Sequence, residues 1–281
     1  MALILLGSAV LLIASLLGWI FRAPASDGLS PISRASERHQ ALDCASIDRR
    51  NLLVILLLGQ SNAANHGQTR GDPVANVFSF HDGHCYRAAD PLPGATGDGG
   101  SVWMRLAPHL LRPGQVDAVL LAPLAVNSTS ISQWNAHPVL LEGLQRMVGQ
   151  LTHAGFHASM VLWHQGEAES FKGTSGDAYR EGFAQMLQRL RQLGVDATVW
   201  VALATRCQAR SNTAVHAAQA ELPRLHAGTR AGPDLDRLFD PYHRYDGCHF
   251  STPGLEAAAL AWRSAIAEGL AAQAPVGVQT R

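Results

Sequence analysis

From residue 51 onward the chain alternates short apolar runs with longer amphipathic stretches, and this alternation constrains its fold more than any other feature. Apolar runs of strand length cover 52–58, 118–126, 158–163, 198–204 and 237–239. Helical periodicity covers 102–111, 138–154, 177–193, 214–227 and 253–272. Strands and helices that alternate in this way form a parallel sheet with helices on both faces. The sequence therefore predicts an α/β fold, a three-layer α/β/α sandwich around a mostly parallel five-stranded sheet.

The residues before this pattern divide into an apolar segment and a polar one. Residues 2–21 carry no charge, and a helix of that length spans a hydrocarbon core of about 30 Å. Three readings stay open: a transmembrane anchor or uncleaved signal over 1–21, a cleaved signal ending near the small-x-small site at 23–25, or a buried core helix. Residues 22–50 are rich in Pro and Ser and predict a linker. The folded domain is placed at 51–275, followed by a tail at 276–281.

The charge pattern bears on location and partners. Arginines follow the apolar segment, which by the positive-inside rule favours a cytoplasmic body. The even cysteine count and the cleavage-like site favour export, and we expect a membrane-anchored or secreted protein on the extracytoplasmic face. Lys and Arg total 22, as do Asp and Glu. This balance, without a basic block, argues against a nucleic-acid partner.

The segment 67–101 is irregular and rich in Gly, Pro and Asp. Its glycines lack both the GxxxxGK[ST] pattern and a GxGxxG between a strand and a helix, so no nucleotide cofactor is expected. We interpret the segment as a loop that forms one wall of a substrate cleft.

Polar clusters follow the predicted strands. Gly-Gln-Ser-Asn occupies 59–62, Asn-Ser-Thr-Ser 127–130, and His-Gln-Gly-Glu 164–167, while Asp-Gly-Cys-His occupies 246–249. In a parallel sheet the carboxyl ends of the strands share one edge, where open α/β proteins bind their ligands. The four clusters are therefore expected to converge on one site.

These clusters hold the groups that ester hydrolysis requires. Ser61 is the candidate nucleophile, His249 its base and Asp246 the group that orients the base, because Asp-x-x-His on a turn brings the carboxylate to the near ring nitrogen. The candidate oxyanion donors are the backbone N–H groups of Ser61 and Asn127 and the side-chain amide of Gln165. This chemistry needs no metal.

Each assignment has a structural alternative. Ser61 could be an N-cap and Asp-x-x-His an Asx-turn with a surface histidine. Gln165 and Glu167 could satisfy loop backbone, and His164 could be a core histidine. The convergence of all four clusters favours the catalytic interpretation.

In these clusters the chain resembles the SGNH hydrolase superfamily, and within it the sialate O-acetylesterase-like branch of carbohydrate acetylesterases. Gly-Gln-Ser-Asn, Trp-His-Gln-Gly-Glu at 163–167 and Asp-Gly-Cys-His-Phe-Ser at 246–251 carry the resemblance, which covers roughly 51–270. It implies an SGNH or flavodoxin-like sheet, with Ser61 as nucleophile, Asp246 and His249 completing the triad, and Gln165 in the oxyanion hole.

One position departs from the family pattern. Where the family commonly has Gly-Gly-Thr-Ser-Ile, this chain has Asn127 before Ser-Thr-Ser-Ile. A backbone N–H of glycine normally points at the oxyanion there, and asparagine tolerates positive φ better than most residues. Contacts to substrate are assigned to Gln60, Asn62, Gly100, Ser128 and Glu167, and Gln60 and Asn62 are also expected to fix the turn around the serine.

The sequence thus predicts a serine esterase that removes O-acetyl groups from a carbohydrate, either sialic acid or a polysaccharide, through an acyl-enzyme. The partners expected are an acetylated carbohydrate and, through the N-terminal segment, a membrane. The alternatives are an α/β-hydrolase-type esterase or lipase, and a membrane-tethered glycan-binding protein with a decayed site. A metalloenzyme built on His81, His84, Cys85, His164 and Glu167 has no recognisable ligand spacing.

The four cysteines allow two bridges. Cys207 and Cys248 both follow predicted strands at the same edge, where a bridge would brace the catalytic loop. Cys44 and Cys85 would then tie the linker to the cleft loop. Free buried thiols are the alternative for either pair.

Overall fold

The computed structural model describes residues 28–271, and the predicted anchor or signal at 1–21 and the tail at 276–281 lie outside them. Within the described part, no helix is both long enough and apolar enough to cross a membrane. The sheet has eight strands in the order β1-β4-β3-β5-β2-β6-β7-β8. Their bounds are β1 Ala41–Leu42, β2 Leu52–Gly59, β3 Val77–His81, β4 His84–Arg87, β5 Ala118–Ala125, β6 Met160–His164, β7 Thr198–Leu203 and β8 Thr229–Asp234.

The centre of the sheet is parallel. β2 pairs in parallel with β5 on one side and β6 on the other, and β3, β7 and β8 continue the parallel arrangement. Every residue of β5 is buried, as are the last six of β2. Strands that are covered on both faces need such continuous apolar runs, which explains why these two were readable from the sequence.

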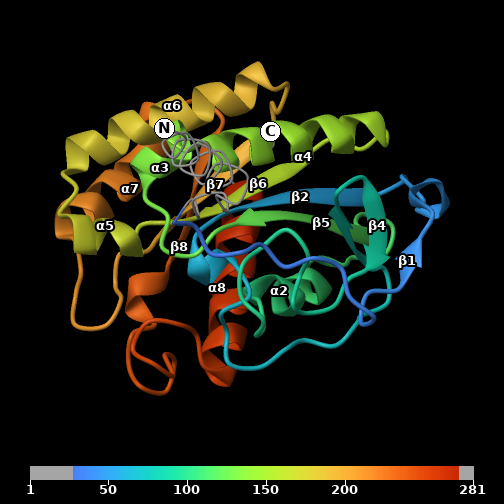
Figure 1. The fold of residues 1–281 in the computed structure, drawn as a ribbon, viewed down its shortest axis with the longest axis horizontal. Coiled ribbons are helices and arrows are strands. Elements are labelled where there is room, and N and C mark those ends of the chain that lie inside the picture. The colour runs from blue at the N-terminus through green and yellow to red at the C-terminus, as the bar shows by residue number, and fades with distance from the viewer. Residues whose placement is uncertain (1–27, 272–281) are drawn as a thin grey trace, which may run out of the picture.

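Helices cover both faces of the sheet (Figure 1). One face packs on α2 (Val102–Leu110) and α8 (Thr252–Ala271), whose buried side chains form one core cluster. The other face packs on α3 (Ile131–Ala136), α4 (Pro138–His153), α6 (Gly176–Gln192) and α7 (Thr213–Leu225). The short α5 (Glu167–Lys172) follows β6. The predicted three-layer, mostly parallel α/β/α architecture is confirmed.

The number of strands differs from the five predicted. The stretch 237–239 is not a strand: the 3₁₀ helix η3 (Leu235–Arg237) ends there, and the last parallel strand is β8. β8 reads Thr-Arg-Ala-Gly-Pro-Asp. Its glycine and proline disfavour strand by propensity, so only pairing with β7 makes it one.

The predicted cleft loop contains a β-hairpin. β3 and β4 pair antiparallel, and the two residues between them, Asp82 and Gly83, have φ of 49° and 78°. Asp-Gly is a preferred pair for a two-residue hairpin turn that needs positive φ at both positions. The signal was present in the sequence, but the strands are only five and four residues long.

The described part of the predicted linker lies against the domain edge. β1 pairs with β4, Ile32 bridges Thr96, and the 3₁₀ helix η1 (Cys44–Ser46) begins at a disulfide-bonded cysteine. Both predicted disulfides are present, Cys44–Cys85 and Cys207–Cys248. The alternative of free thiols is therefore wrong.

Candidate active site

The turn that carries Ser61 is built around Gly59. β2 ends at Gly59, whose φ is +143°, and a Cβ there would lie 2.0 Å from the His164 carbonyl oxygen. The 3₁₀ helix η2 (Ser61–Ala63) starts two residues later, and Ser61 is 2% exposed. The Ser61 hydroxyl forms no hydrogen bond with any residue of 28–271. A buried serine on a tight turn, with its hydroxyl uncommitted, is arranged as a nucleophile would be.

Gln60 fixes this turn to the end of β6. Its side chain is buried, and Oε1 accepts hydrogen bonds from the backbone N–H groups of Gly166 at 3.3 Å and Ala168 at 3.0 Å. Its own backbone N–H donates to the His164 carbonyl at 3.1 Å. The expectation that Gln60 fixes the turn is confirmed by these bonds.

Asn62 joins three of the predicted clusters. Its Nδ2 donates to Glu167 Oε1 at 2.6 Å and to the carbonyl oxygen of Cys248 at 3.2 Å. One buried amide therefore ties the residue beside Ser61 to the end of β6 and to the residue beside His249. The clusters meet at the carboxyl edge of the sheet, as predicted.

Glu167 is a buried partner in this network. It is 1% exposed, and His164 Nε2 lies 3.2 Å from its Oε1. Burial alone would raise the pKa of Glu167, but the neighbouring His164 and the hydrogen bond from Asn62 outweigh it and the pKa is lowered. The structure thus places the side chains of Gln60, Asn62 and Glu167, all assigned to substrate contact, in a buried hydrogen-bonded framework next to the Ser61 turn.

Asp246 and His249 form the predicted pair. His249 Nδ1 donates to Asp246 Oδ2 at 2.6 Å, and Asp246 Oδ1 accepts the backbone N–H groups of Cys248 at 2.9 Å and His249 at 2.7 Å. Burial would raise the pKa of Asp246, yet the hydrogen bonds from His249 and Cys248 lower it, so the carboxylate stays ionised. Because Nδ1 carries the proton, Nε2 is left as the basic nitrogen.

The loop that holds this pair is braced from inside. Arg244 is buried, and burial lowers its pKa to about 10. Its guanidinium donates to the carbonyl oxygens of Leu235 at 3.1 Å, Leu238 at 2.7 Å and Cys248 at 2.6 Å. The Cys207–Cys248 disulfide ties the same loop to the end of β7.

The two further oxyanion candidates are engaged in the free protein. The Asn127 backbone N–H donates to Thr96 Oγ1 at 2.9 Å, and the positive φ in this turn, 59°, belongs to Ser128. Asn127 therefore does not adopt the positive φ that asparagine tolerates better than most residues. Gln165 is fully buried, and its Nε2 donates to the Thr129 carbonyl at 3.0 Å and to Glu169 Oε1 at 2.7 Å.

Glu169 is a site residue that sequence reasoning missed. It is 1% exposed, and Oε1 accepts from Gln165 and from the backbone N–H of Ile131 at 2.6 Å. It therefore connects the ends of β5 and β6. The available signal was the second glutamate in Gln-Gly-Glu-Ala-Glu, two residues after Glu167.

His66 was missed as well. Its ring stacks on that of His249 with centroids 5.1 Å apart and an interplanar angle of 25°. It follows Ser61 by five residues, and no spacing rule predicts that two histidines 183 positions apart become neighbours.

The remaining two predicted contacts differ in accessibility. Gly100 is buried, and its N–H and carbonyl both pair with Gly67 at 2.8 Å, while a Cβ there would lie 1.8 Å from the Thr69 carbonyl oxygen. Close backbone approach explains this glycine. Ser128 is exposed, and its Oγ donates to Asn127 Oδ1 at 3.1 Å.

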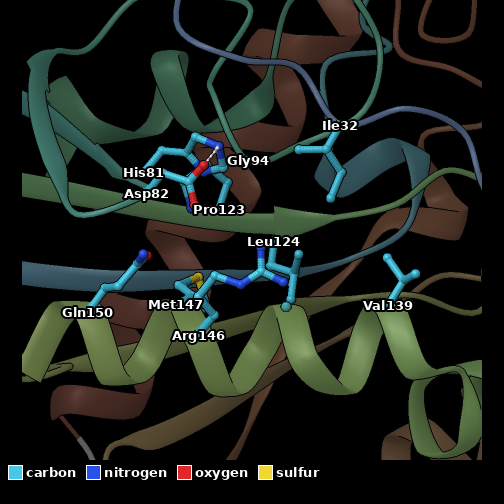
Figure 2. Close-up of a pocket in the computed structure, with 11 residues that line it drawn as sticks. Ile32, His81, Asp82, Gly94, Pro123, Leu124, Val139, Arg146, Met147 and Gln150 are labelled. Carbon is cyan, nitrogen blue, oxygen red and sulfur yellow. Dashed lines mark ion pairs between the residues drawn. The ribbon is translucent and has the colours of Figure 1, made fainter.

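Two described cavities lie apart from this site. Figure 2 shows the first, between α4, which contributes Arg146 and Met147, and the β3–β4 hairpin, which contributes His81 and Asp82. The second lies beyond β7 and β8, between Thr205, His216 and Asp236. None of the predicted site residues lines either cavity.

The residues of the metal alternative have other partners in the fold. Cys85 is disulfide-bonded, and His164 and Glu167 face each other in the buried network. Across residues 28–271 no three His, Cys, Asp or Glu side chains gather in a way that could hold a metal ion.

The comparison with protein families covers the part of the chain that holds this site. Residues 51–259 match the family described as "Carbohydrate esterase, sialic acid-specific acetylesterase". The chain belongs to this family. It is therefore a carboxylic ester hydrolase, and the enzyme class predicted from the sequence is confirmed. No match was found among curated proteins.

Solved structures support the fold. A protein from Arabidopsis thaliana is similar with a TM-score of 0.60 at 16% identity, covering 80% of this chain and 99% of its own. NanS is similar with a TM-score of 0.56 at 15% identity, covering 79% and 98%. At these identities the likeness shows the shared architecture alone.

Proposed function

We propose that this family member removes O-acetyl groups from a carbohydrate through a Ser61–His249–Asp246 triad and an acyl-enzyme. The observation that carries the proposal is the pair of hydrogen bonds from Asn62, which tie the residue after Ser61 to Glu167 and to the residue before His249. Nucleophile and base are thereby anchored through one buried side chain.

In the first step Ser61 Oγ attacks the ester carbonyl carbon while its proton passes to His249 Nε2. Asp246, 2.6 Å from Nδ1, stabilises the imidazolium. The tetrahedral intermediate then collapses: the bond to the sugar oxygen breaks, and that oxygen takes the proton from Nε2. In the second step water attacks the acyl carbon and gives a proton to His249 Nε2. The bond between that carbon and Ser61 Oγ then breaks, Oγ takes the proton from Nε2, and acetate leaves.

The oxyanion is held by the Ser61 N–H, the Asn127 N–H and Gln165. The last two donate within the protein in the free form, to Thr96 Oγ1 and to Thr129 and Glu169. A developing negative oxygen is a stronger acceptor than a hydroxyl or a carbonyl. These donors therefore turn to the oxyanion, or share their hydrogens with it, as charge develops.

A carbohydrate substrate suits the surface beside the base. Tyr245 is 48% exposed and its ring centroid lies 6.4 Å from that of His249. An exposed tyrosine offers an apolar face and a polar tip, which match the two kinds of surface on a sugar ring. The family description names sialic acid, and sialic acid or an acetylated polysaccharide is the proposed substrate.

The location proposed is the extracytoplasmic side of a membrane, with the chain anchored or secreted. Two disulfides, one of them bracing the catalytic loop, support it because disulfides persist in oxidising compartments. The apolar residues 2–21 supply the anchor or signal in this proposal.

The test is acetate release from an aryl acetate by the full chain and by Ser61→Ala. Loss of a triad nucleophile costs about 10⁶ in kcat. Ser46→Ala, on η1, is the matched control and keeps full activity. A Ser61→Ala variant that retains near wild-type activity would refute the triad.

A fluorophosphonate probe separates the enzyme from a decayed binding protein. The wild type should be labelled at Ser61 and Ser61→Ala should not. Absence of labelling in a folded wild type would favour the decayed site.

A further inference from the structure

His66 occupies a position that the proposed mechanism does not yet use. Its imidazole lies nearly parallel to that of His249, with ring centroids 5.1 Å apart. Asp246 binds His249 at its Nδ1 edge, so the stacked ring covers a face that Asp246 leaves open. Together the two contacts limit both the tilt and the rotation of the base.

The other edge of His66 leads to the oxyanion region. His66 Nε2 lies 3.1 Å from Thr96 Oγ1, and the same oxygen accepts the Asn127 N–H at 2.9 Å. Thr96 is fully buried. Because its oxygen already accepts from Asn127, its own proton is available to His66 Nε2, which leaves the His66 proton on Nδ1.

His66 is itself held in place. A Cβ on Gly97 would lie 2.9 Å from its Cδ2, and the Tyr245 hydroxyl donates to its carbonyl oxygen at 3.3 Å. The glycine leaves room for the ring, and the tyrosine holds the backbone. The ring therefore has a defined orientation between Thr96 and His249.

Burial is the main reason that His66 stays neutral. Burial and, after it, the interaction with His249 lower the pKa of His66 to about 4, while Asp98 and Asp246 act in the opposite direction. A neutral ring can stack on His249 in both protonation states without the repulsion that a second imidazolium would create.

We propose that His66 is a positioning residue for this esterase: its ring holds the face of His249, and its link through Thr96 Oγ1 sets the Asn127 N–H relative to the base. The inference rests on the proposed triad. It assigns to this histidine the coupling of two parts of the site, the base and the oxyanion donor, that lie on different segments of the chain.

The experiment compares variants of the full chain by kcat, KM and the pH profile of kcat/KM. His66→Phe keeps a stacking ring but removes Nε2, and we expect kcat to fall about tenfold to hundredfold with KM little changed. His66→Lys places a fixed positive charge beside His249, which disfavours the imidazolium, so the acidic limb of the profile moves to lower pH. His84→Phe, an exposed histidine outside the site, should behave as wild type.

Thr96→Val removes the hydroxyl that bonds to His66 and leaves the ring of His66 to stack on His249. Thr96→Val should reproduce the kcat loss of His66→Phe. The double variant His66→Phe with Thr96→Val should lose no more kcat than either single variant, because both substitutions remove the same hydrogen bond between His66 Nε2 and Thr96 Oγ1. An unchanged acidic limb in a folded His66→Lys variant, or losses that multiply in the double variant, would overturn the inference. The double-variant result decides even if His66→Lys does not fold. Fluorophosphonate labelling of wild-type Ser61 is run in parallel, and its absence would overturn the proposed function itself and this inference with it.

Discussion

Two Asp-x-x-His turns lie six residues apart in this chain, and they are nearly identical in local structure. Asp240 accepts the backbone N–H of His243 at 3.0 Å and its Nδ1 at 2.9 Å. Asp246 accepts the same two groups of His249 at 2.7 Å and 2.6 Å. Both carboxyl groups have a lowered pKa, chiefly through the histidine bond at Asp240, and through bonds that overcome burial at Asp246.

The two turns differ in the contacts that they make with the rest of the protein. His249 stacks on His66, and its neighbour Cys248 bonds to Asn62 and is bridged to Cys207. His243 packs edge-on against the exposed Tyr242. An Asp-x-x-His turn by itself thus orients a histidine, and long-range contacts distinguish His249, whose turn is tied to that of Ser61 through Asn62, from His243.

The largest expected effect is a loss of kcat that separates the two aspartates. Asp246→Asn removes the ionised acceptor that selects the tautomer of His249, and kcat should fall about 10⁴-fold. Asp240→Asn alters an equivalent turn and should leave kcat near the wild-type value. Aryl acetate kinetics measure both, and equal losses would mean that the two turns share the function.

The second effect compares the disulfides, each of which joins cysteines 41 residues apart. Because the closed loops are equal, Cys207→Ser with Cys248→Ser and Cys44→Ser with Cys85→Ser should each lower the free energy of unfolding by about 4 kcal/mol. Only the first pair braces the His249 turn, so only it should lower kcat at a temperature where both proteins are folded. Denaturant unfolding and steady-state kinetics are the measurements, and equal kcat values would show that the bridge does not position the base.

The third prediction concerns the hydrogen bond from Asn62 to the carbonyl oxygen of Cys248, the residue before His249. Asn62→Ala removes the amide that donates to Glu167 Oε1 and to the Cys248 carbonyl oxygen. The loss of these buried hydrogen bonds should cost about 1–3 kcal/mol of stability, and kcat should fall because the turn of His249 is no longer tied to the turn of Ser61. Asn65→Ala is the matched control: this asparagine is also buried, and it bonds Leu92 and Ala95 instead. A similar stability loss without a kcat loss is expected there, and a kcat loss of the same size would remove the special role of Asn62.

The smallest effect is a pH dependence that only the His249 side should show. The pKa of His66 is lowered from 6.5 to about 4 in the folded protein, so between these values the unfolded chain binds a proton that the folded one does not. Stability therefore declines as pH falls from about 6.5 to about 4, modestly because the ring is partly exposed. Melting temperatures of wild type and His66→Phe over this range should show a flatter slope in the variant, and parallel slopes would argue against the lowered pKa.

Much of the fold followed from sequence because its central strands are buried on both faces. β2, β5, β6 and β7 are largely apolar runs, and polar clusters lie at the carboxyl ends of the first three. β8 was misplaced and the β3–β4 hairpin was overlooked, since a polar edge strand and a short hairpin owe their structure to pairing more than to composition.

The candidate site also has parts that the sequence predicted and parts that only packing decided. Local sequence was sufficient to predict the Ser61 turn and the Asp246–His249 pair, because a glycine at a strand end and an Asp-x-x-His turn are set by contacts within a few residues. Packing alone decided that His66 meets His249, that Glu169 joins β5 to β6, and that the donors at Asn127 and Gln165 are engaged in the free protein. These contacts join segments up to 183 positions apart, and periodicity carries no information about which distant side chains a folded sheet edge brings together.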